Sequence, residues 1–283
     1  MPGREVRTNI GTGSVPAMTA GAFFDLDRTL MAGSSGMAWV RASYDAKLIS
    51  RGQMLRWARD GIVFRLRGST DATTKAAMDK ISEVLKGTSG RDLERLAPQV
   101  LAGVLPRIYP EMLAEVHSHQ DAGRPTFIVS AAGNDLVEVV AQVLGMEGGI
   151  GTRYELDAEG RFTGRLDGPF MYGEGKLEGM QGFADAHDID LGESWAYSDS
   201  ASDLPMLRAV ANAVVVNPDV ALLEVARAEG WRVIRFEKLG RRLAVAGATL
   251  TAAAVGGGSA LVARRRRRAP GGTWRSRPAS RRR

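Results

Sequence analysis

The sequence contains no cysteine, which excludes disulfide bonds, thiolate metal sites and cysteine nucleophiles. Histidine is also scarce, with three residues in 283. His117 and His119 are two apart in a segment of helical pattern, so they point to different faces, and His187 is isolated. We expect no histidine metal site and all three histidines at the surface. The first 20 residues lack an apolar run of secretory-signal length, so we expect a cytoplasmic location.

Acidic residues are missing from one end of the chain. Ten arginines and no Asp or Glu follow Ala263, and removing these ten charges from the formal net charge of +6 leaves −4 for residues 1–263. The composition is otherwise that of an ordinary globular protein, 44% hydrophobic and 25% charged. The basic isoelectric point therefore reflects the tail and carries no information about a substrate of the body.

Short apolar segments alternate with amphipathic ones on both sides of a long helical stretch. Strands are expected at 22–25, 126–129, 194–197, 213–216 and 232–236, helices at 134–144, 176–187, 204–211 and 220–229, a hairpin at 152–156 and 161–166, and a glycine-rich turn at 148–151. Residues 36–120 are rich in Ala, Leu, Arg and Met at helical spacing and predict helices such as 54–66 and 73–85. This alternation indicates an α/β fold with a parallel sheet, interrupted by a helical insertion.

Polar side chains stand where three of the expected strands end. Asp25, Ser130 and Asp199 each close or follow an apolar run. Ligands of open parallel sheets bind outside the carboxyl ends of the strands. We therefore expect these three side chains at one edge of the sheet.

These residues suit the hydrolysis of a phosphate ester. Asp25 and Asp27 are two apart, so one carboxylate can attack phosphorus while the other donates and removes protons. Asp199 and Asp203 add oxygen ligands of the kind that Mg²⁺ prefers. Ser130, with the amides after it, and Lys176 can neutralise phosphoryl charge. Taken singly, each has an ordinary structural explanation: a turn or helix cap for the Asp pair and Ser130, a solvated helix position for Lys176.

The four features, in this order, resemble the motifs of the haloacid dehalogenase superfamily, specifically its phosphoserine-phosphatase-like class IB branch, over roughly residues 21–236. The family's DxDxT motif matches Asp25, Asp27 and Thr29, its strand-end Ser or Thr matches Ser130, its Lys matches Lys176, and its DxxxD pair matches Asp199 and Asp203. The resemblance implies a Rossmann-like three-layer core with an inserted α-helical cap that closes over the site.

The resemblance also implies roles for these residues in a Mg²⁺-dependent phosphatase that forms an aspartyl-phosphate. Asp25 would be the nucleophile and a metal ligand, Asp27 the acid/base and a ligand through its carbonyl, and Asp199 the third ligand. Asp203 would support the metal waters and orient Lys176. Substrate-binding candidates are Thr29, Ser130, Ala131 and Lys176. Thr29 is equally suited to satisfying local backbone groups.

Three positions depart from the phosphoserine phosphatases. Ser34 stands nine residues after Asp25, where those enzymes resemble one another in carrying a Glu that binds the substrate amine; Ala131-Ala132 replace Gly-Gly, and Ser202 replaces Asn. We therefore expect a small phosphate monoester, phosphoserine-like or related, and doubt strict phosphoserine specificity. Candidates for binding a second anionic group are the arginines Arg41, Arg51, Arg56, Arg59 and Arg65.

The expected domain organisation has five parts: a flexible extension at 1–20, the core at 21–35 and 121–238, the cap region at 36–120, an apolar helix at 239–263 and a disordered tail at 264–283. Residues 243–263 carry no charge and would span ~31 Å as a helix, enough for a bilayer, although Ala and Gly dominate. Segment 243–268 is therefore a candidate for membrane contact or an interfacial helix. Nucleic acid is not an expected partner, and the sequence leaves the oligomeric state open.

Two alternative functions remain. The chain could act on a lipid-linked phosphate at a membrane, or it could be a non-catalytic membrane or nucleic-acid adaptor that kept the fold. The complete set of Asp25, Asp27, Lys176 and Asp199 argues against the adaptor.

Overall fold

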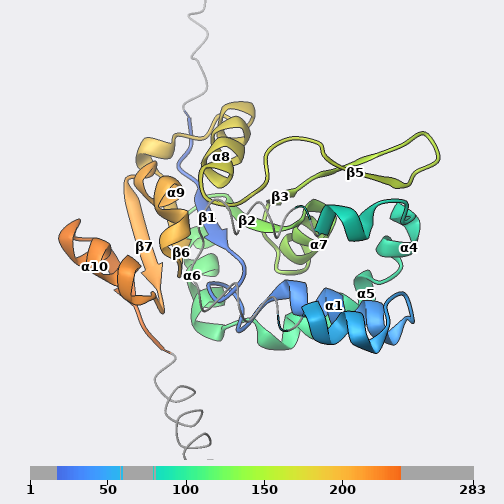
Figure 1. Ribbon diagram of the computed structural model, residues 1–283. Helices are drawn as coiled ribbons and strands as arrows, with labels where there is room; N and C mark the ends of the chain where they lie inside the picture. The colour runs from blue at the N-terminus through green and yellow to red at the C-terminus, as the bar shows by residue number, and fades with distance from the viewer. Residues whose placement is uncertain (1–17, 58, 60–78, 80, 237–283) are drawn as a thin grey trace, which may run out of the picture. The chain divides into compact units, whose positions relative to one another are not determined.

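The computed structural model describes residues 18–57, 59, 79 and 81–236 (Figure 1). The chain divides into two units, Met1–Arg235 and Phe236–Arg283. The candidate membrane segment and the arginine tail lie outside the described residues, as do most of the N-terminal extension and parts of the two helices expected at 54–66 and 73–85. Within the described part of the chain, no helix is both long enough and apolar enough to cross a membrane.

A parallel sheet of six strands forms the centre of the first unit, in the order β3-β2-β1-β6-β7-β8. The strands are β1 (Ala22–Asp25), β2 (Thr126–Gly133), β3 (Gly148–Thr152), β6 (Trp195–Ser198), β7 (Asn212–Val216) and β8 (Arg232–Ile234). β1 lies between β2 and β6, and its Phe23 is in register with Phe127 and Ala196. The predicted α/β fold with a Rossmann-like parallel sheet is confirmed.

Apolar side chains of β1 alternate between the two faces of the sheet. Phe23 belongs to a buried cluster with Met180, Leu207 and Leu222 from helices on one face. Phe24 faces the other way and stacks on Tyr197, with ring centroids 4.3 Å apart. The helices that pack on the strands are α6 (Pro110–Asp121), α7 (Asn134–Val143), α8 (Glu174–Ala186), α9 (Leu204–Arg208) and α10 (Val220–Ala228). Single-turn 3-10 helices are η2 (Leu191–Glu193) and η3 (Ala201–Asp203).

The glycine-rich segment 148–151 is a strand, β3, and the expected turn was wrong. Its glycines are required by the close approach of α7. A Cβ on Gly149 would lie 2.7 Å from the carbonyl carbon of Val137, and one on Gly151 would lie 2.5 Å from Cα of Asn134. The glycines of this segment, which are typical of a turn, are here explained by a strand whose backbone is in direct contact with the backbone of a helix.

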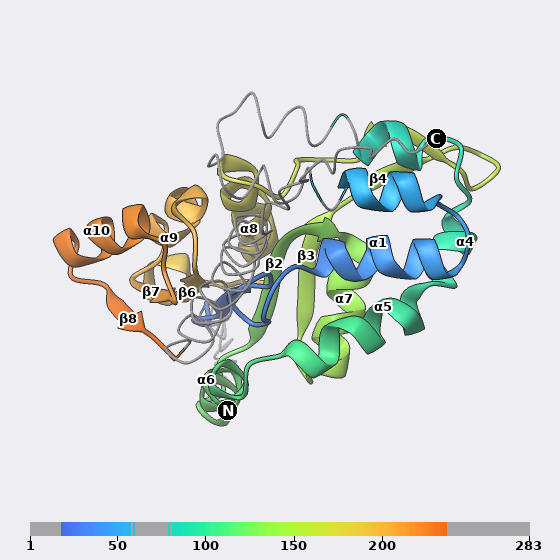
Figure 2. The same cartoon turned by 60° about the horizontal axis from the view of Figure 1, so that its bottom comes forward.

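The described part of the cap region is helical apart from connecting turns and isolated bridges. It contains α1 (Ser35–Asp45), α4 (Gly90–Glu94), α5 (Ala97–Val104), the 3-10 helix η1 (Leu105–Arg107) and helical residues at 51–57 and 81–85. α1 runs beside α5 in both views (Figures 1 and 2). A Cβ on Gly103 would lie 3.1 Å from Cβ of Ala38, so these two helices also pack closely.

A hairpin after β3 joins the core to the cap region. Its strands are β4 (Tyr154–Leu156) and β5 (Phe162–Leu166), and it begins later than expected because Thr152 belongs to β3. Phe162 O accepts from Gly87 N at 2.8 Å, Thr88 O accepts from Phe162 N at 3.0 Å, and Gly160 O accepts from Gly90 N at 3.0 Å. We call these main-chain contacts the hairpin clamp; Figure 1 shows the hairpin reaching α4.

A polar network extends from the buried His119 to the exposed Arg232. Arg124 Nε donates to His119 Nδ1 at 2.8 Å, so the proton of the neutral ring is on Nε2, which lies 2.8 Å from the Tyr197 hydroxyl. Tyr197 donates to Glu115, and Glu115 is paired with Arg232 at 2.6 Å. The expectation that His119 lies at the surface was wrong, because α6 packs its side chain under β6, leaving it 3% exposed. His117 and His187 are exposed, as expected.

Candidate active site

The end of β1 places Asp25 beside a buried lysine. Lys176 Nζ, from the first turn of α8, donates to Asp25 Oδ1 at 2.5 Å and to Asp203 Oδ2 at 2.7 Å. All three side chains are nearly inaccessible, with relative exposures of 6% for Asp25, 3% for Lys176 and 2% for Asp203. Residues up to 178 positions apart in the sequence thus form one charged group at the carboxyl edge of the sheet.

Hydroxyl groups add further partners, one of them Ser202 Oγ, which donates to Asp203 Oδ1 at 3.4 Å. Thr29 donates to Asp25 Oδ2 at 2.9 Å, and Ser198 donates to Asp203 Oδ2 at 2.7 Å. Thr29 therefore contacts the candidate nucleophile. Ser198 was not among the predicted residues, although its position directly before Asp199 on a strand end offered a signal.

Asp27 is held by the start of the cap region. Ser34 Oγ donates to Asp27 Oδ2 at 2.9 Å and Ser35 N donates to Asp27 Oδ1 at 2.8 Å. Ser35 is the first residue of α1, so the carboxylate also lies at the positive end of that helix. The Ser34 contact was not predicted, because nothing in the spacing of these residues shows a bond across the turn.

Asp199 has a different environment from the other carboxylates. It is 4% exposed, and its Oδ2 lies 3.0 Å from Arg28 Nη2, in an ion pair that lacks hydrogen-bond alignment. Oδ2 is consequently a buried oxygen without a hydrogen-bond donor in the described residues. Arg28 has a left-handed backbone, with φ of +66°, in the turn after β1. Its role was not predicted, because it occupies a variable position of the motif.

Burial shifts the charge states of this group. It raises the pKa of Asp199 to about 8, with the charge of Asp25 adding to the effect and Arg28 opposing it. Burial likewise raises the pKa of Asp25 to about 6, with Lys176 opposing. For Lys176, burial acts to lower the pKa, but Asp203 and Asp25 outweigh it and raise the value. The carboxylates are thus short of positive charge even with Lys176 in place.

Ser130 follows Val129, the residue in register with Asp25, and it is buried. Its Oγ accepts from Ala132 N at 3.2 Å. The carbonyl of Ala131 accepts from Thr152 Oγ1 at 3.0 Å. Ser130 does not cap the next helix, because β2 continues to Gly133 and Gly133 is the N-cap of α7. The structure therefore excludes the alternative explanation of Ser130 as a helix cap.

The expected arginines of the cap region that the structure describes lie at its surface. Arg41 pairs with Asp45 at 3.0 Å, both side chains being largely exposed. Arg51, Arg56 and Arg59 are also exposed, and Arg65 lies outside the described residues.

The donor set at this edge fits a small divalent cation. Among the described residues, Asp199 Oδ2 is a buried oxygen that lacks a hydrogen-bond donor, and burial raises the pKa of both Asp199 and Asp25 although Arg28 and Lys176 lie beside them. A hard cation with oxygen ligands would compensate the negative charge of these two carboxylates. Among the described residues no group of three or more His, Asp or Glu side chains could hold a metal ion. A site here therefore needs ligands besides two carboxylates, such as a main-chain carbonyl and water.

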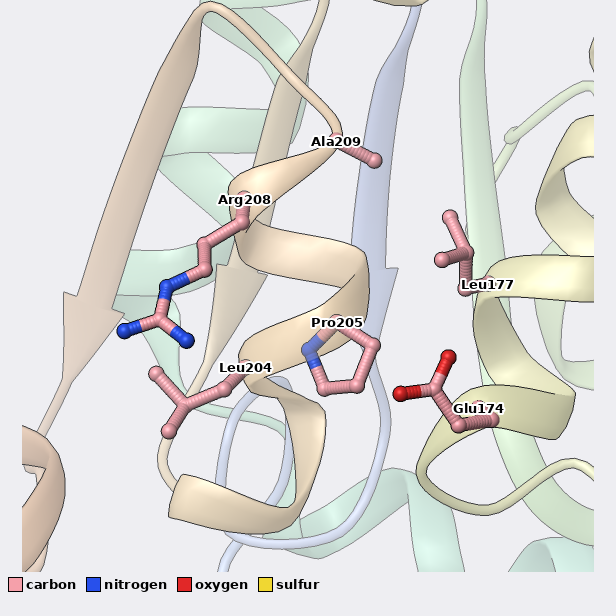
Figure 3. A pocket seen from close by; sticks show the side chains of 6 residues that line it. All are labelled: Glu174, Leu177, Leu204, Pro205, Arg208 and Ala209. Atoms are coloured by element: carbon pink, nitrogen blue, oxygen red, sulfur yellow. The ribbon is translucent and has the colours of Figure 1, made fainter.

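A shallow groove of about 380 Å³ lies beside this site, between α8 and α9 (Figure 3). It is lined by Glu174, Leu177, Leu204, Pro205, Arg208 and Ala209. None of these is a predicted site residue, although Glu174 and Leu177 flank Lys176 in sequence. Its arginine is already paired with Glu229 at 2.7 Å. The lining of the groove thus includes none of Asp25, Lys176, Asp199 and Asp203.

The described residues thus form a Rossmann-like parallel sheet with one lysine and four aspartates at its carboxyl edge, which places the chain in the class of α/β proteins with an acidic site at the strand ends. The sequence profile described as "haloacid dehalogenase-like hydrolase" matches residues 22–208. The chain belongs to the haloacid dehalogenase-like hydrolase family.

Curated relatives support this assignment. The inhibition of morphological differentiation protein of Streptomyces azureus is 34% identical over 218 residues, covering 77% of this chain and 78% of its own. Phosphoserine phosphatase SerB1 of Mycobacterium tuberculosis is 32% identical over 232 residues, covering 81% and 75%. A histidinol-phosphatase of Neisseria meningitidis is 31% identical over 224 residues, covering 76% and 98%. The predictions of the family and of a haloacid dehalogenase-type phosphoric monoester hydrolase are confirmed.

Solved structures agree on the fold. A protein of unknown function from Bordetella pertussis superposes with a TM-score of 0.68 at 28% identity, covering 77% of this chain and 98% of its own. An apo phosphoserine phosphatase superposes with a TM-score of 0.53 at 17% identity, covering 78% and 94%. At that identity the second match supports the fold alone.

Proposed function

We propose that the chain is a Mg²⁺-dependent phosphatase that hydrolyses a small phosphate monoester through an aspartyl-phosphate on Asp25. The observation that carries the proposal is the position of Lys176, which joins Asp25 and Asp203 at 2.5 and 2.7 Å at the strand edge where Asp199 Oδ2 lacks a hydrogen-bond donor. A nucleophile, a fixed positive charge and a cation-binding oxygen then lie together where a phosphoryl group is to be transferred.

In the first half of the reaction, an oxygen of Asp25 forms a bond to phosphorus while the bond to the leaving oxygen breaks. Protonated Asp27 gives its proton to that oxygen. In the second half, a water oxygen forms a bond to phosphorus, the bond to Asp25 breaks, and Asp27 takes a proton from the water. Asp27 thus starts the next cycle protonated, and both halves balance.

The remaining residues hold the reacting groups and their charge. Lys176 and Thr29 fix the two oxygens of Asp25, and Ser130 lies one position beyond the residue in register with it. The cation, held by Asp25, Asp199 and the Asp27 carbonyl, would neutralise phosphoryl oxygens as negative charge develops. Asp203 holds Lys176 through a second hydrogen bond of its ammonium group.

The substrate we propose is a small phosphate monoester, phosphoserine-like or related, without strict specificity for phosphoserine. Ser34 stands where phosphoserine phosphatases carry the amine-binding Glu, and its hydroxyl is engaged with Asp27. Relatives of similar identity are named for different substrates, phosphoserine and histidinol phosphate. The chemistry shared by the family therefore does not determine which alcohol is released from the ester.

The test is phosphate release by the full chain with Mg²⁺ and with EDTA, on phosphoserine, histidinol phosphate, glycerol 3-phosphate, sugar phosphates and p-nitrophenyl phosphate. We expect Mg²⁺-dependent release from at least one. Acid quenching with ³²P-labelled substrate should leave label on the wild-type protein and none on Asp25→Asn. Folded protein that is silent on every ester would contradict the proposal, and label retained by Asp25→Asn would contradict the nucleophile.

A further inference from the structure

The carboxylate of Asp27 is fixed by two donors from the start of α1. Ser35 N donates to Oδ1 at 2.8 Å and Ser34 Oγ donates to Oδ2 at 2.9 Å, so each oxygen has its own donor. Ser35 is 1% exposed, which makes its amide a rigid partner. The Asp27 side chain is therefore oriented from the cap region and not from the sheet.

Ser34 does not perform the usual task of its position. It is the N-cap residue of α1, with extended backbone angles of −135° and 132°, yet its side chain makes no capping bond to the helix. Serine at an N-cap normally accepts a hydrogen bond from an amide two or three residues later. Here the hydroxyl is directed to a carboxylate outside the helix, so its contribution is to Asp27.

The two contacts leave room for the proton that is transferred. The carboxyl group has about four lone-pair sites, and Ser35 N and Ser34 Oγ each occupy one of them. Ser34 can therefore keep donating to Asp27 Oδ2 while another lone pair of the carboxyl carries the proton for the leaving oxygen. A proton donor must lie within hydrogen-bond reach of the leaving oxygen, and small misplacements are costly.

We propose that Ser34 is a positioning residue that aims Asp27 at the leaving-group oxygen throughout the cycle. The inference rests on the proposed function, in which Asp27 is the acid/base. The step that depends on Ser34 is the transfer of a proton from Asp27 to the leaving oxygen as the bond between that oxygen and phosphorus breaks. An ester whose leaving group departs as a stable anion needs this transfer less.

The experiment compares kcat/KM for phenyl phosphate and p-nitrophenyl phosphate, two esters of similar shape. Phenolate is the poorer leaving group and needs the proton. We expect Ser34→Ala to lower kcat/KM for phenyl phosphate about tenfold and to change the value for p-nitrophenyl phosphate by less than about twofold. Ser34→Thr, which keeps a hydroxyl, should restore most of the loss.

The matched control is Ser50→Ala, because Ser50 Oγ accepts from Gln53 N at an exposed helix start in the same cap region. We expect that variant to behave as wild type on both esters. Equal losses on the two esters, no loss on either, or the same pattern in Ser50→Ala would overturn the inference. Ser34→Gly gives the same test if Ser34→Ala does not fold, since glycine is tolerated at an N-cap. Wild-type protein that is inactive on these two esters and on every other ester of the panel above would instead contradict the proposed function.

Discussion

Two groups of polar side chains in this fold differ in whether their buried atoms all have partners. In the network of Arg124, His119, Tyr197, Glu115 and Arg232, which runs from a buried histidine to an exposed arginine, each side chain has a partner within the chain. At the carboxyl edge of the sheet, Lys176 donates to Asp25 and Asp203, while Asp199 Oδ2 has no hydrogen-bond donor among the described residues. A completed network adds stability and specifies packing, whereas an incomplete one keeps capacity for a ligand. The proposed function therefore uses the incomplete group.

The largest expected effect is on the nucleophile. Asp25→Asn should lower turnover about 10⁴-fold or more, because an amide cannot form the phosphoryl intermediate. Phosphate release measures the loss, and a thermal melt should still show one cooperative transition. Asp45→Asn is the matched control, since Asp45 is an exposed partner of Arg41. Near wild-type rates in Asp25→Asn would mean that the group around Asp25 does not carry the catalytic function.

Removing the lysine should affect both stability and activity. Lys176→Met leaves Asp25 and Asp203 buried without their cation, so we expect the free energy of unfolding to fall by about 3–5 kcal/mol and turnover to be lost. Urea denaturation gives the first quantity. Lys86→Met, at an exposed position, should leave the denaturation midpoint unchanged. Coincident curves for Lys176→Met and wild type would show that this group contributes nothing to folding.

The network around His119 should affect stability alone. His119→Gln cannot satisfy both Arg124 and Tyr197 in the same geometry, so we expect unfolding to become easier by about 1–3 kcal/mol with kcat unchanged. If kcat falls in fully folded His119→Gln protein, the His119 network influences the site around Asp25, and the expectation that it affects stability alone is wrong.

The same histidine gives the fold a sensitivity to acid. Burial, with help from the charge of Arg124, lowers the pKa of His119 to about 4, whereas an unfolded histidine titrates near 6.5. The unfolded state therefore binds more protons between these values, and stability falls as pH drops from about 6.5 to about 4. Melting temperatures across this range should decline less steeply in His119→Gln than in His117→Gln, whose histidine is exposed on the same helix.

The smallest expected effect is on the affinity for Mg²⁺ of the site around Asp199. Arg28 pairs with Asp199 Oδ2, the oxygen proposed for the cation, so Arg28→Gly should tighten Mg²⁺ binding by about fivefold. Glycine also suits the backbone φ of +66°. Calorimetric titration of metal-free protein gives the affinity. Arg107→Gln is the control, because its guanidinium lies near Gly33 in the same region. An unchanged or weaker affinity for Arg28→Gly would contradict competition between Arg28 and the cation.

The sequence predicted those parts of the molecule that follow from chain order. Strands ending in Asp25 and Asp199 had to reach one edge of a parallel sheet, and the family motifs supplied Lys176 and Asp203. It did not predict β3, because Gly149 and Gly151 are set by contact with α7 rather than by a local turn. Burial of His119 was missed for a similar reason: a lone polar residue shows its partners only after distant strands come together.

The contacts of Asp27 and Asp199 were beyond sequence reasoning for a different reason. Ser34 and Arg28 act through side-chain direction across a tight turn, and residue type does not fix that direction. The spacing of the motif residues could show only which side chains take part in the site. Their mutual geometry depended on the left-handed residue at position 28 and on where α1 begins.

The hairpin clamp has a consequence for how this protein can diverge. Its bonds join main-chain atoms of Phe162 and Gly160 to those of Gly87, Thr88 and Gly90, so they survive most changes of side chain. Substitutions of side chains in the described helices of the cap region therefore leave this attachment to the hairpin in place. Chimeras that exchange helices between relatives should be joined outside residues 87–90 and 160–162, where the seam would cut none of these bonds.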